Sequence, residues 1–440
     1  MTQSAAAPSP PATQPVPAPT PPQPAKARRG FWPAPTGKPV GAGVEDTPGL
    51  LNRLQVIGIA TVLLFALISG LVQLLSYQSD GRAADDTEQL VRVQEIQSTL
   101  LRVDAIATNV VLVGGEGDPA RDSDYDDALA DVFTLIAAAA EAQPADEAAL
   151  AALNVEVNDY ATGIAEARAN VRQTFPIGAE YLSGASAALR SDALPILANL
   201  VEANTERAED SMAGQHPYWL LLVGVITVAV LVWLSIVLAS RFRRYLNVGV
   251  AVAAAIVIVT TLVAFAAAWR ADNQNDALLE EELQMAVDQA AARTAGNDAK
   301  AYESLRLIKR GSGALYEDPW VEKAGVVDNL GDEQVLDEWD AYVEAHEEID
   351  RLDDEDRWGL AVQIAVGAES APGDLNSTAA FDEFDTEVAA LVEENGETTT
   401  DELRGGRSFA LVGSILTLVL GFVAAVAIAR GISARRKEYA

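Results

Sequence analysis

Residues 217–270 read PYWLLLVGVITVAVLVWLSIVLASRFRRYLNVGVAVAAAIVIVTTLVAFAAAWR. Two runs without a charged residue lie here, on either side of an arginine-rich turn. Two similar runs occur elsewhere, so that the four charge-free runs cover about 54–76, 217–239, 246–269 and 408–429. A helix of any of these lengths can cross the ~30 Å hydrocarbon core of a bilayer. The sequence therefore predicts an all-α membrane protein with four transmembrane helices.

The charged residues are segregated from the apolar ones. The 440 residues are 50% hydrophobic, yet the net charge is −33. Twelve of the 31 Lys and Arg residues, but only three of the 64 acidic residues, lie before the first run, in the arginine turn or after the last run. The two long segments between runs carry a net charge of −42. By the positive-inside rule, we expect a multi-pass plasma-membrane protein with both termini in the cytoplasm and both long segments outside.

The predicted organisation repeats one plan twice, which indicates an old duplication. The first 49 residues hold 13 of the 20 prolines, as expected of a disordered tail. The predicted segments are a disordered cytoplasmic tail over 1–49, transmembrane helices over 50–77, 217–240, 246–269 and 408–430, an extracytoplasmic four-helix bundle over 78–216, a cytoplasmic arginine turn over 241–245, a second extracytoplasmic helical bundle over 270–407 and a cytoplasmic tail over 431–440.

Apolar residues in the first outer segment recur at alternating steps of three and four, the period of helices that pack along one seam. The predicted seam residues are Val93, Ile96, Leu100, Val103, Ala107 and Val110, then Tyr125, Leu129, Val132, Ile136 and Ala139, then Leu150, Leu153, Val157, Tyr160, Ile164, Ala167 and Val171. Glycine and proline breaks between them predict helices over 78–113, 121–142, 146–175 and 179–213. Pro195 should kink the last helix without ending it.

The second outer segment follows the plan less regularly. We expect a long helix over 270–315, a short one over 354–367, and loops over 316–333 and 368–376. Two further seams are formed by Val335, Trp339, Tyr342, His346 and Ile349, and by Phe381, Phe384, Val388 and Leu391.

The first and last helix of each outer segment are expected to run on into the membrane. A continuous helix over 54–113 would measure on the order of 90 Å. Such a rod can pass a piston, tilt or rotation across the bilayer. Small residues at four-residue spacing, Gly413, Thr417 and Gly421, suit close helix packing in lipid.

The composition excludes several kinds of site. Without Cys, the chain has no disulfide, thiolate-ligated metal or thiol nucleophile, and His216 and His346 are its only histidines. The Gly-rich stretches 114–117 and 311–313 follow no strand and lack the lysine of a phosphate-binding loop, so they read as helix ends. We therefore expect no catalytic site, no cofactor and no bound nucleic acid, and the chain is not expected to be an enzyme.

Two acidic clusters have alternative interpretations. Asp122, Asp124, Asp126 and Asp127 resemble part of a calcium loop, but they lack its Gly and Glu, and acids at the start of a helix also favour its dipole. The cluster Asp350, Asp353, Asp354, Glu355 and Asp356 is either a solvated corner or a cation site. Helix capping and a solvated corner are the interpretations we favour.

Several other polar residues could bind a ligand or serve the fold. His346 lies on a predicted seam and is expected to be a hydrogen-bonded core residue, with pH sensing as the alternative. Arginines that could meet the carboxylate of an amino acid, or simply form ion pairs, are Arg92, Arg102, Arg172 and Arg190.

Two basic segments are candidates for docking a cytoplasmic partner. In the tail, an aromatic pair follows two arginines, at Arg28, Arg29, Phe31 and Trp32. The turn between the second and third spans contributes Arg241, Arg243 and Arg244. Such residues can anchor in a groove of a partner protein or lie on the anionic lipid of the bilayer.

Three stretches carry a resemblance to a known family. They are RVDAIATNVVLVGG at 102–115, PIGAEYL at 176–182 and YESLRLIKRGSG at 302–313. Together with the four spans and the Pro-rich leader, they resemble the GlnX family of actinobacterial membrane proteins, over residues 50–440. The resemblance implies two partners, an extracytoplasmic lipoprotein that binds glutamate or aspartate and the cytosolic serine/threonine protein kinase G. The bundles also resemble the four-helix sensor domains of chemoreceptors, although no signalling linker follows the second or fourth span.

We therefore expect a transmembrane signal relay that passes an amino-acid signal from a binding lipoprotein to a cytoplasmic kinase. The alternative is an accessory or permease-like component of amino-acid transport. Unbroken spans without charged residues speak against transport. Whether the chain forms a homodimer stays open.

Overall fold

The computed structural model describes residues 47–112, 119–172, 175–242, 247–368 and 370–436. Within these ranges the chain is helical apart from short turns and contains no strand. Four long helical stretches are apolar enough to span a membrane. The predicted all-α membrane fold with four transmembrane helices is confirmed.

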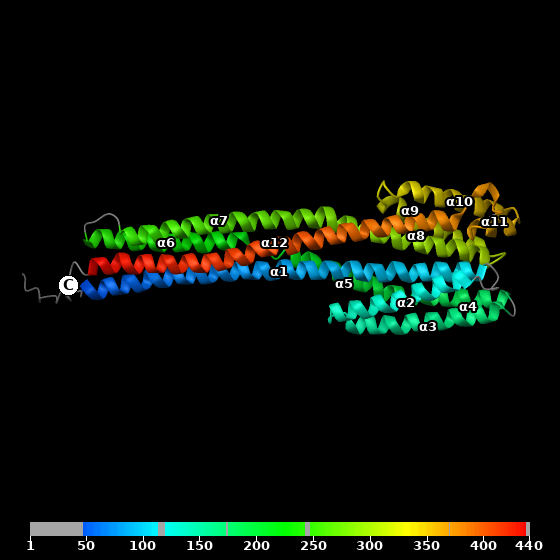
Figure 1. Ribbon diagram of the computed structural model, residues 1–440, viewed down its shortest axis with the longest axis horizontal. Helices are drawn as coiled ribbons and strands as arrows, with labels where there is room; N and C mark the ends of the chain where they lie inside the picture. Colours follow the sequence, from blue (N-terminus) through cyan, green and yellow to red (C-terminus); the bar gives the residue numbers. More distant parts are fainter. Residues whose placement is uncertain (1–46, 113–118, 173–174, 243–246, 369, 437–440) are drawn as a thin grey trace, which may run out of the picture.

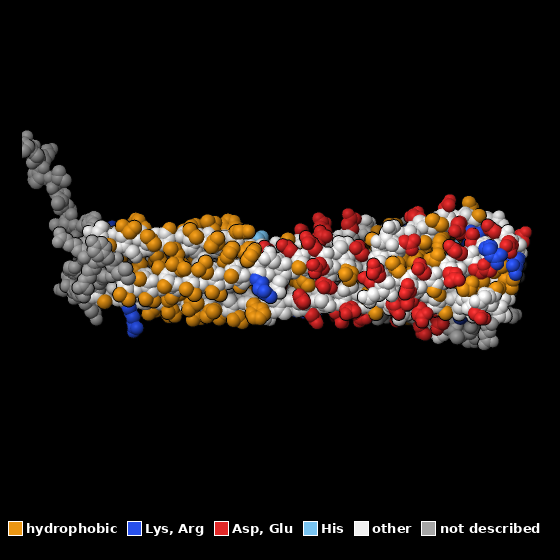
Figure 2. All heavy atoms as spheres, turned by 90° about the horizontal axis from the view of Figure 1, so that it is seen from above, with side chains coloured by type: hydrophobic (Ala, Val, Ile, Leu, Met, Phe, Trp, Pro, Cys, Tyr) orange, Lys and Arg blue, Asp and Glu red, His pale blue; other side chains and the backbone are white. Residues whose placement is uncertain are grey.

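The molecule is one long rod with an apolar half and a charged half (Figures 1 and 2). The apolar half contains parts of four helices: α1 (Thr47–Leu112), α6 (Pro217–Phe242), α7 (Val248–Leu278) and α12 (Ser377–Arg436). They form a four-helix bundle in which α12 packs on α1 and α7, and α6 packs on the other side of the same two helices. Large hydrophobic side chains cover its outside, as a lipid-facing surface requires (Figure 2).

Small residues bring α1 and α12 into close contact in the apolar half. A Cβ atom added to Gly421 would lie 2.2 Å from the Cβ of Ala66. At another point of the same contact between α1 and α12, Gln73 donates a hydrogen bond of 3.0 Å to the hydroxyl of Thr417. The close packing predicted for this stripe is therefore confirmed, and the polar side chains of these spans serve helix–helix contact.

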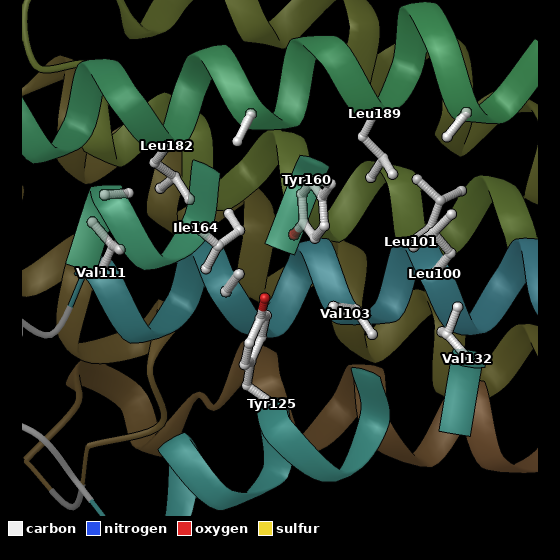
Figure 3. Packing of buried hydrophobic residues seen from close by; sticks show 14 of the residues in the cluster. Leu100, Leu101, Val103, Val111, Tyr125, Val132, Tyr160, Ile164, Leu182 and Leu189 are labelled. Atoms are coloured by element: carbon white, nitrogen blue, oxygen red, sulfur yellow. The ribbon is translucent and has the colours of Figure 1, made fainter. Parts of the chain in front are cut away.

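The first outer bundle packs α2, α3, α4 and α5 around the charged half of α1. Its elements are α2 (Pro119–Ala142), α3 (Glu147–Val171), α4 (Phe175–Ala188), the π-helical turn η1 (Leu189–Ala193) and α5 (Leu194–Met212). All the predicted seam residues lie in the core or pack against it. Figure 3 shows Tyr160 and Ile164 of α3 facing Val103 of α1, with Leu189 of η1 beside them.

The helix that contains Pro195 continues through it, as predicted. Pro195 has no N–H to donate, so the regular hydrogen-bond ladder cannot pass this position unchanged. The chain accommodates it with the wider turn η1 just before the proline. A π-turn of this kind often marks a functional position, and this one carries Arg190.

The second outer bundle contains one helix that the sequence analysis missed. Its elements are the π-helical turn η2 (Leu279–Leu283), α8 (Gln284–Ile308), the 3-10 turn η3 (Gly313–Tyr316), α9 (Glu317–Leu330), α10 (Leu336–Asp354), α11 (Trp358–Ala365), the 3-10 turn η4 (Pro372–Asp374) and α12. The loop predicted over 316–333 is wrong, because α9 fills it. Pro319 lies in the first turn of α9, where its missing N–H costs nothing, and Trp320 and Val327 are buried.

The helix predicted over 270–315 ends earlier, at Ile308. Gly311 follows with φ of +81°, a conformation that glycine adopts easily, so this Gly-rich stretch ends a helix as expected. The other Gly-rich stretch, 114–117, lies outside the described residues, as does the tail over 1–46.

The two outer bundles are packed against each other and do not stand apart. In Figure 1 the first bundle lies on one side of α1 and α12 and the second on the other. Helix α1 packs on α2 and α5 of the first bundle and on α8 and α12 of the second. Buried side chains from both bundles meet in a shared cluster that includes Ile164 of α3, Leu307 of α8 and Ile349 of α10.

Three of the four connections to the apolar half are continuous helix, and one is not. Helices α1 and α12 run through without a break, and α7 continues through η2 into α8. The continuation expected from the first bundle into the second span is wrong, because α5 ends at Met212 and α6 begins at Pro217. Asp80 of α1 fixes this break by accepting hydrogen bonds from Gln215, at 2.7 Å, and Asn275 of α7, at 3.2 Å.

The close contact of α1 and α12 leads to a stability prediction. Gly421→Ala should lower the melting temperature of the detergent-solubilised protein, because its Cβ would clash with Ala66; overpacking of this kind costs about 1–3 kcal/mol. Gly405→Ala in the same helix is the matched control, since nothing lies within 4 Å of its added Cβ. Melting is followed by tryptophan fluorescence. An equal melting temperature for the two variants would contradict the close packing of α1 and α12.

Candidate functional site

The centre of the charged half contains a buried carboxylate in contact with three helical elements of the first bundle. Asp104 of α1 is fully buried. It accepts hydrogen bonds from Tyr160 of α3 at 3.0 Å, from Ser186 of α4 at 2.5 Å and from Arg190 of η1 at 2.8 Å. A buried charge is tolerated only where partners of this kind replace water. Asp104 therefore fixes how α1 sits among the other helices of its bundle.

Arg190 extends this contact to the second bundle. Its Nη1 pairs with Asp104, and its Nη2 lies 2.6 Å from the carboxylate of Asp298 of α8. The guanidinium also lies over the ring of Tyr302, with 4.7 Å from Cζ to the ring centroid. Burial alone would lower the pKa of Arg190, but the two aspartates outweigh it and raise the pKa. We call Asp104, Arg190 and Asp298 the inter-bundle bridge.

A second buried carboxylate joins α1, α8 and α12. Asp385 of α12 is fully buried and accepts from Arg293 at 2.8 Å and from Asn297 at 2.7 Å, both of α8. Arg102 of α1 also pairs with Asp385. Burial alone would raise the pKa of Asp385, but Arg293 and Arg102 reverse this and lower it. The long helices that enter the membrane are thus cross-linked by charge in the outer half.

His346 is a buried core residue, as predicted, and it lies against charged groups. Its Nδ1 is 3.1 Å from the carboxylate of Glu303, and its ring stacks on Trp320 with 3.6 Å between centroids. Burial alone would lower the pKa of His346, but the carboxylates of Glu303 and Glu317 raise it above its ordinary value. Burial has the opposite effect on Glu303 and alone would raise its pKa, but Lys300 and His346 lower that pKa to about 2.

The acidic corner at the end of α10 surrounds an arginine that the sequence analysis did not connect to it. Arg306 of α8 is 3% exposed and lies within ion-pair distance of Asp350, Asp353 and Asp354. Glu355 and Asp356 are exposed, in agreement with the solvated corner. No group of three or more side chains that could hold a metal ion occurs in the described ranges.

A cleft of about 440 Å³ opens beside the Arg102–Asp385 contact, between α1, α2, α8 and α12. Its charged lining residues are Arg102, Arg121, Lys300, Asp124, Asp127, Asp131 and Asp382. It therefore unites one of the predicted arginines with two members of the acidic run at the start of α2. Both signs of charge are present, as the ammonium and carboxylate groups of an amino acid would require. Arg102 already pairs with Asp382, at 3.3 Å, so a ligand would have to displace that contact.

Most of the other predicted residues have structural partners. Arg92 pairs with Glu88 at 2.7 Å, so that the ion-pair interpretation holds for Arg92, Arg102 and Arg190, whereas Arg172 is exposed at the end of α3. In the acidic run, Asp122 and Asp126 face Arg168, at 3.6 and 3.9 Å.

Most of the predicted docking residues lie outside the described part of the chain. Arg28, Arg29, Phe31, Trp32, Arg243 and Arg244 lie outside the described residues. Arg241 lies in the last turn of α6.

Sequence reasoning missed the carboxylates at the centre of these contacts. Asp104 sits next to the seam residue Val103, so it was hidden among apolar neighbours. From Gly296 to Ile308 nearly every residue of α8 is buried, Asp298 and Glu303 included. A helix with charged residues but no solvated face is the signal that could have indicated them.

The inter-bundle bridge should be sensitive to loss of its cation. Arg190→Leu leaves Asp104 buried without a counter-charge and leaves Asp298 only the more distant Lys323, at 3.7 Å; loss of one partner of a buried pair costs about 3–5 kcal/mol in comparable cases. Arg351→Leu is the control, because Arg351 forms two ion pairs at 2.6 Å but is exposed. We expect a large fall in unfolding temperature for the first variant and almost none for the second. Equal falls in unfolding temperature for the two variants would show that the inter-bundle bridge contributes no more to stability than an exposed ion pair.

His346 should make stability depend on pH. Its folded pKa is raised, so its stabilisation is complete below the unfolded pKa of 6.5 and fades as the pH rises through the folded value. The melting temperature of the wild type should therefore exceed that of His346→Gln most at about pH 5.5–6 and progressively less at higher pH. A difference that is constant across this range, in melting curves recorded at matched ionic strength, would contradict the charged pair with Glu303.

Comparison with known proteins identifies the first bundle. Residues 79–213 match the family model of the actinobacterial sensor domain. This range begins in the outer part of α1 and ends with α5, so it covers the whole of the first bundle and includes Asp104 and Arg190. The chain matches no curated protein and no solved structure. A sensor domain on four apolar helices gives this membrane protein a sensing or signalling role.

Proposed function

We propose that the chain is a transmembrane signal relay. Its charged half receives a glutamate or aspartate signal from an amino-acid-binding lipoprotein outside the cell, and its other end passes the signal to a cytoplasmic serine/threonine protein kinase. The arginines at the ends of the spans support this orientation. The resemblance to the GlnX family supports the choice of partners.

The single observation that carries the proposal is the continuity of α1. This helix of 66 residues begins at the end of the apolar half and reaches the far end of the charged half, packed on α12 along the way. A rigid helix transmits a shift or a rotation along its axis, and helix shifts of about 1–2 Å are a common form of signalling motion. The sensor domain and the membrane bundle share this one element.

The alternative, a component of amino-acid transport, has weaker support. Transporters mark their substrate path with broken helices and ionisable residues near the middle of the membrane. Where the structure describes them, the four charge-free runs contain neither feature, and Gln73 and Thr417 bond to each other. Vesicles that contain only this chain should therefore take up no labelled glutamate, and ligand-independent uptake would favour transport.

The relay is tested with the full chain in nanodiscs and a purified glutamate- and aspartate-binding lipoprotein from the same organism. We expect the affinity of the lipoprotein to differ by at least about tenfold between its ligand-bound and ligand-free states. The kinase, added on the other face, should be retained in one of these states only. Absence of lipoprotein binding in both states would overturn the proposed function.

A further inference from the structure

A separate cavity of the charged half, of about 340 Å³, lies where α1, α8 and α12 meet, with α2 on one side. The residues of α1 that line it fall between positions 88 and 98, so it is nearer to the apolar half than the cleft at Arg102. Its apolar walls are formed by Val91, Leu135, Ala290, Ala389 and Val392. A cavity of this size, with apolar walls and few polar groups, suits a small organic molecule. We call it the proximal pocket.

The two arginines that line the proximal pocket are already engaged. Arg293 of α8 donates to both carboxylate oxygens of Asp385, at 2.8 and 3.1 Å, and to the hydroxyl of Ser98 at 3.3 Å. Arg92 of α1 pairs with Glu88 at 2.7 Å. Neither arginine is therefore left over for an anionic ligand.

The acceptors of the pocket, in contrast, lack partners. Gln94 of α1 lines the pocket and is 5% exposed, and its Oε1 is buried without a hydrogen-bond partner among the described residues. The other two lining acids, Glu95 of α1 and Glu393 of α12, form no side-chain hydrogen bond or ion pair with the part of the chain that the structure describes. A buried acceptor without a donor is costly, so the pocket calls for a group that donates.

The two unpaired carboxylates also repel each other. Burial raises the pKa of Glu95 and the charge of Glu393 raises it further, and Arg293 and Arg92 only partly offset these effects. Both glutamates are exposed, so a cation can reach them from the solvent. A positive charge beside them would remove the repulsion between α1 and α12 at this point.

An ammonium group matches this set of acceptors. It carries three N–H donors, one for the amide oxygen of Gln94 and one for each carboxylate. A metal ion fits less well, because the described ranges contain no group of three or more His, Asp or Glu side chains that could hold one. We propose that the proximal pocket binds a small primary amine, whose ammonium group takes Gln94, Glu95 and Glu393 as acceptors and whose hydrocarbon part packs on the apolar walls.

The pocket touches every continuous helical connection between the outer half and the membrane half. These connections are α1, α12 and α8, which continues α7 through η2 and packs with the other two (Figure 1). A bound amine would hold α1 to α12 through Glu95 and Glu393, next to the Arg293–Asp385 pair that joins α8 to α12. The site goes beyond the proposed function, because amine binding requires neither the lipoprotein nor the kinase.

The first test compares n-butylamine with n-butanol on the full chain in nanodiscs, by isothermal titration calorimetry with empty nanodiscs as the blank. The two probes share their hydrocarbon chain and differ in the charged group. We expect the amine to bind at least about tenfold more tightly than the alcohol, because hydrogen bonds to charged groups are worth that much.

Two matched pairs of variants locate the site. Gln94→Leu and Glu393→Gln should each weaken butylamine binding by at least about tenfold, whereas Gln97→Leu and Glu394→Gln, which lie nearby but do not line the pocket, should change it by less than about twofold. Gln94→Leu should leave the melting temperature unchanged or raise it, because it removes a buried acceptor that has no partner. Its loss of binding is then separate from any loss of fold.

The outcomes also separate this site from the relay. Butylamine that binds no better than butanol, or that binds equally well to Gln94→Leu and Glu393→Gln, would overturn the amine site and leave the proposed function standing. If butylamine binds as expected but no lipoprotein is retained, the proposed function fails and the amine site stands.

Discussion

The structure depends on one buried interaction, in which Arg190 holds Asp104 and Asp298 together. A buried ion pair gives little net stability compared with an apolar contact, but it is costly to break, because either charge left alone lacks water. It therefore defines the geometry of a junction more than it strengthens it. In this protein the junction lies between two helical bundles, and it fixes a relative position that apolar packing alone would leave freer to slide.

The two outer bundles are packed together and are joined to the membrane half by the continuous helices α1 and α12 and by α7 with η2 and α8. Asp385, like Asp104, is a buried carboxylate that pairs with cations of neighbouring helices, here where α1, α8 and α12 meet. Nearer the apolar half, Asp80 ties the one interrupted connection to α1 and α7. Buried carboxylates thus occur at the outer centre and at the entrance to the membrane, and α1 contributes to each junction. A structural change at the far end of the charged half can therefore be transmitted along α1 without a break in the helix.

The regular parts of the fold could be predicted from the sequence, whereas the junctions could not. Charge-free runs locate the spans and the period of 3.5 locates the seams, because both patterns are local. Helix α9 was missed although its one proline, Pro319, lies in the first turn, where a missing N–H is harmless. Arg190 was expected to meet a ligand carboxylate or to form an ion pair, but its partner Asp298 was not singled out, since their pairing joins residues 108 positions apart.

The central claim is that the charged half and the opposite end of the apolar half move together. The chain contains no cysteine, so spin labels can be placed at Asn52→Cys of α1 and Val248→Cys of α7, both exposed near that end. Saturation with the binding protein should shift the distance between the labels by about 1–2 Å, the size of signalling helix shifts. An unchanged distance distribution at full occupancy would contradict the account, because the outer half would then be bound without any effect at the other end of α1.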